Sequence, residues 1–104
     1  MKEHFKGENH SLGIVYLNYA NLLIQTNQLD KAQTYLSKSE KIFKKYFDVS
    51  HNNFGDLYLA YGDFYKKKKE DVLSKENYQK ALKIYSDKFD ENHYKVKSVK
   101  QKIK

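Results

Sequence analysis

Hydrophobic positions along this chain recur at the three- and four-residue spacing of amphipathic helices. In the first stretch they fall at Leu12, Tyr16, Tyr19 and Leu23, and short polar segments separate this stretch from four later ones. No segment alternates with period two over a useful length, so the pattern favours no strand. The predicted fold class is therefore all-α. The predicted helices cover residues 11–26, 29–47, 53–68, 71–89 and 94–103.

The chain also matches itself when it is shifted by 42 residues, without a gap. Ten matched positions keep their size and polarity: Tyr16/Tyr58, Tyr19/Tyr61, Ala20/Gly62, Leu23/Tyr65, Ala32/Ser74, Leu36/Tyr78, Ser39/Ala81, Ile42/Ile84, Phe43/Tyr85 and Phe47/Phe89. A fixed period of this length is typical of helical-repeat proteins, in which each unit packs on its neighbours.

Small and aromatic residues stand at fixed offsets within each unit. The first unit reads Tyr16-x2-Tyr19-Ala20-x2-Leu23 and then Ala32-x3-Leu36, and the second reads Tyr58-x2-Tyr61-Gly62-x2-Tyr65 and then Ser74-x3-Tyr78. This arrangement resembles the tetratricopeptide repeat. Polar turns that end in His10, His51 and His93 make it similar to the longer, kinesin-light-chain type of that repeat.

The resemblance implies a right-handed superhelical array of antiparallel helix pairs, an α-solenoid of about five helices. It would form one domain over residues 1–104, with repeat one at about 11–50, repeat two at about 53–92 and a terminal helix at 94–103. Ala20 and Ala32 are expected to be buried where the helices of the first pair cross, because a larger side chain would force them apart.

Composition narrows the classes of function. The 104 residues carry a net charge of +7, and all 20 basic residues are lysine. Arginine is the side chain that makes planar, bidentate contacts with phosphate and guanine, so its absence argues against nucleic acid as a partner. There is no cysteine, which excludes disulfides and thiolate sites. No apolar run reaches the ~18–20 residues of a membrane span, and no signal-peptide pattern is present, so we expect a cytoplasmic protein.

Candidate catalytic and metal-binding residues are few. His10, His51 and His93 recur at about the repeat period, so they cannot meet at one ion, and we expect them to act in turns or helix caps. Asp56 and Asp63 lie seven residues apart, about 10 Å along one helix, which is too far for an acid/base pair; we expect them to be solvated. Scattered glycines form no phosphate-binding loop. The sequence therefore predicts no enzyme, cofactor or metal site.

Partner-binding candidates come from the resemblance and from charge. In tetratricopeptide arrays the first helix of each repeat lines a concave groove, and by helical phase the groove positions here are Ile14, Leu17, Asn18, Asn21, Ile24, Gln25, Asp56, Leu59, Ala60, Asp63 and Lys67. Asn18 and Asn21 could hydrogen-bond to a peptide backbone. A second candidate is the run Lys66, Lys67, Lys68 and Lys69, which offers an electrostatic contact with an acidic surface.

Three hypotheses about function follow. The first is a non-catalytic scaffold, a small subunit or fragment within a larger hetero-complex, and as its setting we consider a cytoskeletal or ciliary assembly with acidic, tubulin-like surfaces. The second is an adaptor that binds a peptide in the groove. The third, an RNA-associated helical repeat, is the least favoured because arginine is absent.

Overall fold

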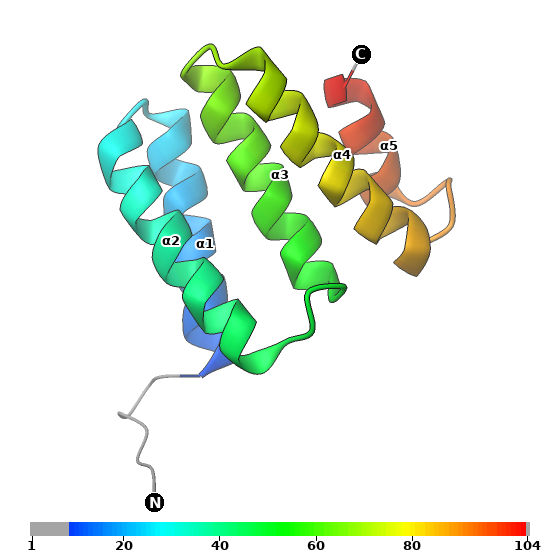
Figure 1. The fold of residues 1–104 in the computed structure, drawn as a ribbon, viewed down its shortest axis with the longest axis horizontal. Helices are drawn as coiled ribbons and strands as arrows, with labels where there is room; N and C mark the ends of the chain where they lie inside the picture. The colour runs from blue at the N-terminus through cyan, green and yellow to red at the C-terminus, as the bar shows by residue number, and fades with distance from the viewer. Residues whose placement is uncertain (1–8, 104) are drawn as a thin grey trace, which may run out of the picture.

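The computed structural model describes residues 9–103 and shows five α-helices in this part of the chain (Figure 1). The helices are α1 (His10–Gln25), α2 (Leu29–Tyr46), α3 (Asn52–Lys67), α4 (Asp71–Lys88) and α5 (Tyr94–Ile103). No strand occurs between residues 9 and 103. The predicted all-α class is confirmed, and every predicted helix boundary lies within one residue of the observed one.

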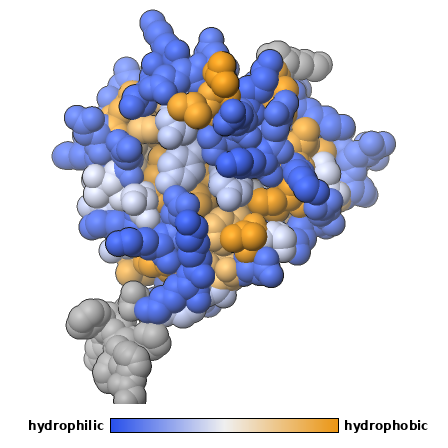
Figure 2. Space-filling view, viewed as in Figure 1, coloured by the Kyte–Doolittle hydropathy of each residue, from blue (hydrophilic) through white to orange (hydrophobic). Residues whose placement is uncertain are grey.

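Helices α1 and α2 form one antiparallel pair, α3 and α4 form the next, and α5 packs along α4 at the far end of the row (Figure 1). Buried side chains from α1, α2 and α3 make one cluster: Leu17, Ala20, Leu23, Ile24, Ala32, Leu36, Phe43, Phe54, Leu57, Ala60 and Phe64. A second cluster joins α4 to α5 through Tyr78, Ala81, Tyr85, Val96 and Val99. Hydrophilic residues predominate on the face shown in Figure 2, with hydrophobic residues scattered between them.

The 42-residue correspondence extends to the helix ends. His51 caps α3, since its Nδ1 atom accepts a hydrogen bond from the backbone N–H of Asn53 at 3.0 Å. His93 Nδ1 accepts from the N–H of Lys95 at 3.2 Å in the same way. The cap of α1 is Asn9, which lies 42 residues before His51, and not His10. The expected capping role is therefore confirmed for two of the three histidines, and asparagine takes that role in the first repeat.

Helices α1 and α3 also end alike. Asn27 and Lys69, 42 residues apart, both have a φ of 63°. This left-handed conformation ends a helix by turning the next backbone N–H groups back to its last carbonyls. Gln28 accordingly donates to Leu23 O at 2.8 Å. The two turns are thus built on the same backbone geometry despite their different sequences.

Small residues let the helices of each pair approach closely. Ala20 and Ala32 are completely buried, as predicted. In the second pair, the Ser74 hydroxyl donates to the Gly62 carbonyl at 2.8 Å. In the first pair a second close contact lies toward the other end of the crossing helices, where Ser39 donates to the Gly13 carbonyl at 2.8 Å.

Candidate functional site

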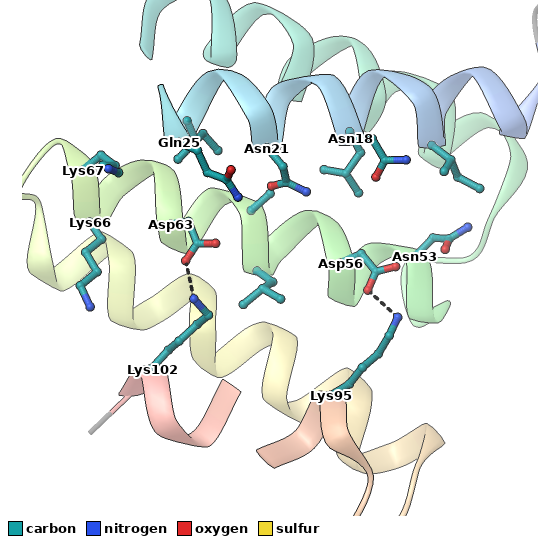
Figure 3. Close-up of a pocket in the computed structure, with 15 residues that line it drawn as sticks. Asn18, Asn21, Gln25, Asn53, Asp56, Asp63, Lys66, Lys67, Lys95 and Lys102 are labelled. Carbon is teal, nitrogen blue, oxygen red and sulfur yellow. Dashed lines mark hydrogen bonds and ion pairs between the residues drawn. The ribbon is translucent and has the colours of Figure 1, made fainter. Parts of the chain in front are cut away.

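A groove of about 770 Å³ runs between α1, α3 and α5 (Figure 3). Its lining residues are Ile14, Leu17, Asn18, Asn21, Ile24 and Gln25 of α1, Asn53, Asp56, Leu59, Ala60, Asp63, Lys66 and Lys67 of α3, and Lys95 and Lys102 of α5. All eleven positions selected by helical phase lie on this one groove. That they bind a partner stays a prediction.

The α1 wall of the groove presents a row of carboxamides. Asn18, Asn21 and Gln25 follow one another at three- and four-residue spacing, so they project from one side of the helix toward the groove (Figure 3). Within residues 9–103 their side chains make no hydrogen bond to the protein. Each carboxamide carries donors and an acceptor, so this wall can pair with the N–H and C=O groups of an extended backbone.

The opposite wall contains two Asp–Tyr–Lys clusters, defined here as Asp56 with Tyr85 and Lys95, and Asp63 with Tyr78 and Lys102. In the first, Lys95 Nζ lies 3.0 Å from Asp56 Oδ1, which also accepts the Tyr85 hydroxyl. In the second, Lys102 Nζ lies 3.2 Å from Asp63 Oδ1, and the Tyr78 hydroxyl donates to the same oxygen at 2.5 Å. Both ion pairs are drawn in Figure 3.

Each member of these clusters recurs after seven residues on its own helix. Seven residues make about two helical turns, so both copies face the same way on α3, α4 and α5. The lysine nitrogens also lie near the tyrosine rings, with Lys95 Nζ 5.4 Å from the centroid of Tyr85. Three helices are thus connected twice by the same set of side chains.

Burial and the neighbouring carboxylate set the ionisation of the two phenols. Burial of the Tyr85 ring, and then its hydrogen bond to Asp56, raise the pKa of Tyr85 far above its ordinary value. The pKa of Tyr78 is raised for the same two reasons, with Asp63 as its partner. Both phenols therefore stay protonated as donors. Asp56 and Asp63 line the groove and are partly exposed to solvent, and in addition each accepts bonds from α4 and α5 that the sequence did not indicate.

The four lysines of the run are all exposed, but they lie in different surroundings. Lys66 and Lys67 lie in the last turn of α3 and line the groove. Lys68 follows the helix, lies 3.8 Å from the Glu70 carboxylate and sits 5.3 Å from the Phe64 ring centroid. Lys69 adopts the left-handed conformation that ends the helix. Half of the run therefore lines the groove, and that the four lysines contact an acidic surface stays a prediction.

The groove is positively charged overall, since four lysines and two aspartates line it. Sequence analysis did not place Asn53, Lys66, Lys95 or Lys102 there. The contribution of α5 was missed because helical phase within one segment does not show which neighbour its polar face meets. The shared seven-residue spacing of the aspartates, tyrosines and lysines was a signal that could have revealed it.

No group of three histidines, aspartates or glutamates between residues 9 and 103 is close enough to hold a metal ion. None of the helices in that range combines the length and apolarity that a membrane span requires. What the groove offers is a set of hydrogen-bonding amides facing ammonium groups.

Comparison of the chain with protein families, curated proteins and solved structures finds no match.

Proposed function

We propose that this chain is a non-catalytic protein-interaction module of the tetratricopeptide kind that binds an extended, acidic segment of a partner protein in the groove between α1, α3 and α5. One observation carries the proposal. Unpaired carboxamides on α1 face lysines across a groove of about 770 Å³, which is the size range of binding clefts. Amides suit the backbone of a bound segment, and ammonium groups suit its carboxylates.

The alternative proposal is a subunit of a larger assembly, for example a cytoskeletal or ciliary one in the cytoplasm, that contacts an acidic surface through the lysine run. Its support is the charge of +7 and the exposure of all four lysines. The two proposals share Lys66 and Lys67, which line the groove, and differ over Lys68 and Lys69, which do not.

Selection of short random peptides displayed on phage, with the full chain as the target, tests the first proposal. We expect the enriched peptides to be rich in aspartate and glutamate. Affinity, measured by fluorescence anisotropy on synthetic copies, should fall about tenfold or more in Asn18→Ala/Asn21→Ala, equivalent to about 1.4 kcal/mol. The matched control is Gln33→Ala/Gln79→Ala, which removes two exposed amides from α2 and α4 outside the groove.

Two lysine variants distinguish the proposals at equal loss of charge. Lys66→Ser/Lys67→Ser should weaken peptide binding and its salt dependence between about 50 and 200 mM, because the pair lines the groove. Lys68→Ser/Lys69→Ser should leave both nearly unchanged. If the two variants weaken binding equally, the whole lysine run is the contact and the assembly proposal is favoured. If no peptide is enriched, or the amide variant and its control behave alike, the groove is not the binding site.

A further inference from the structure

The outer face of α1 carries an apolar stripe that nothing in the described part of the chain covers. Val15, Tyr19 and Leu22 recur at four- and three-residue spacing and are 58%, 41% and 54% exposed. None of them lines the groove, since helical phase sets them about a quarter turn away from its carboxamides. Tyr19 stands at the same repeat position as Tyr61, so its exposure marks a place where the repeat pattern continues without a covering element among the described residues.

The second repeat shows how the same stripe looks when it is covered. The positions 42 residues later are Leu57, Tyr61 and Phe64 of α3. Leu57 is 0% exposed and Phe64 is 2% exposed, and both belong to the buried cluster that α3 shares with α1 and α2. The stripe on α1 therefore corresponds to an interface that this chain already makes once, between α3 and the preceding helix α2.

Hydrogen bonding at that interface indicates the chemistry of the missing element. The Tyr61 hydroxyl donates to Glu40 of α2 at 2.7 Å, and the ring of Phe43, three residues further along α2, lies 5.9 Å from that of Phe54. The counterpart hydroxyl, that of Tyr19, has no hydrogen-bond partner within residues 9–103. Its ring packs edge-on against Tyr35 at 4.8 Å.

The charge next to the stripe also favours an acidic side chain on the covering helix. Lys38 Nζ lies 5.1 Å from the ring centroid of Tyr35, the residue that supports Tyr19. An acidic side chain on a covering helix would therefore meet both a free hydroxyl and a nearby ammonium group.

From this correspondence we infer that the outer face of α1 is a docking surface for an amphipathic helix of a partner protein that presents α2-like chemistry. Such a helix carries an apolar stripe with a carboxylate three residues before an aromatic residue, as Glu40 precedes Phe43. It runs antiparallel to α1, because α2 runs antiparallel to α3. The inference is independent of the proposed groove function.

A second copy of this chain is a poorer occupant. The helix surfaces of the required kind are those of α2 and α4, which correspond at the 42-residue shift. In this structure α3 already covers the first and α5 covers the second, through Val96 and Val99. A second copy would have to give up one of these contacts in order to dock.

The test uses the full chain and, as probe, a labelled synthetic peptide with the sequence of α2, Leu29–Tyr46. We expect saturable binding that Val15→Asp weakens about tenfold or more, because a charge replaces a buried valine at the contact. A peptide with Glu40→Gln should bind about three- to tenfold more weakly. The matched control is Val72→Asp, which places the same charge at another exposed valine, on α4.

A second measurement does not depend on the free peptide being helical. A chain with residues 10–51 duplicated ahead of α1 supplies a covering α2 through the natural turn. In the duplicated chain, the second copy of α1 is the one that the added α2 covers. Val15→Asp in this second copy should lower the melting temperature, whereas the same change in the original chain should not.

Four results would overturn the inference. Equal peptide binding by Val15→Asp and the unaltered chain would place the peptide elsewhere. Self-association of the chain that Val15→Asp abolishes would assign the face to a second copy. Peptide binding that requires removal of residues 1–8 would assign it to that segment. Absence of binding, together with insensitivity of the duplicated chain to Val15→Asp, would show that the face accepts no such helix.

Discussion

Replacing Gly62 with alanine would place a methyl group against the ring of Tyr78. An ideal Cβ at this position would lie 2.4 Å from two ring carbons, well inside contact distance. The ring has little room to move, since it is buried and its hydroxyl donates to Asp63 at 2.5 Å. Overpacking of this kind costs about 1–3 kcal/mol, and the better helix propensity of alanine returns about 1 kcal/mol. We expect a net loss of up to about 2 kcal/mol, or as much as roughly 15 °C in melting temperature.

The first repeat supplies the control for this prediction. Ala20 and Leu36 occupy the positions that correspond to Gly62 and Tyr78, and both are completely buried. The double variant Gly62→Ala/Tyr78→Leu recreates that pair, so the alanine should no longer clash. Urea unfolding of the two single variants and the double variant, followed by circular dichroism, should give a favourable coupling energy of about 1–3 kcal/mol. If Gly62→Ala alone is more stable than the unaltered chain, propensity outweighs packing and the close approach of α3 to α4 is not what fixes this position.

Three further predictions concern α5, pH and the turns. In urea unfolding, Tyr85→Phe should lower the free energy of unfolding by about 1–2 kcal/mol, because the phenol is buried. Lys95→Met should lower it by no more than about 0.5–1 kcal/mol, because the ion pair with Asp56 is partly exposed to solvent. The pKa of Tyr85 is raised in the folded state, so the contribution of its hydroxyl to stability is complete below pH ~10, the pKa of an unfolded tyrosine, and is lost progressively above it. The urea midpoint should therefore fall between about pH 9.5 and 11. In Tyr85→Phe, which lacks the hydroxyl, it should fall less steeply. Lys69→Gly should raise the free energy of unfolding by about 1 kcal/mol by relieving the left-handed backbone, and Asn27→Gly by less, because asparagine tolerates that conformation.

Much of the fold could be predicted because it depends on local signals. The apolar spacing placed every helix end within one residue, and the 42-residue correspondence identified Ala20 and Ala32 as the close contact of the first pair. Helical phase also gathered the groove positions of α1 and α3, since residues on one face of a helix share one neighbour. These are properties that a single segment carries in its own sequence.

What could not be predicted depends on contacts between segments. The lysines of α5 reach the groove because α5 packs along α4 with its polar side toward α3, and the sequence signal for that direction is only the seven-residue spacing that Lys95 and Lys102 share with residues of α3 and α4. Tyr19 occupies the same repeat position as Tyr61, yet it is 41% exposed, because burial of that position requires a helix on the outer side of α1. Sequence pattern shows which positions suit a core but not whether a neighbour is present to cover them.

Comparison of the two repeats shows which groove residues are free to bind a ligand. The α1 counterparts of Asp56 and Asp63 are Ile14 and Asn21, so only the second repeat places carboxylates on this wall. Those carboxylates are occupied by bonds from α4 and α5, and their lysine partners are occupied in turn. A ligand carboxylate that recruited Lys95 or Lys102 would have to compete with an existing ion pair. Lys66 and Lys67 have no carboxylate partner within residues 9–103, so they are the groove lysines from which we expect direct contacts with an acidic ligand.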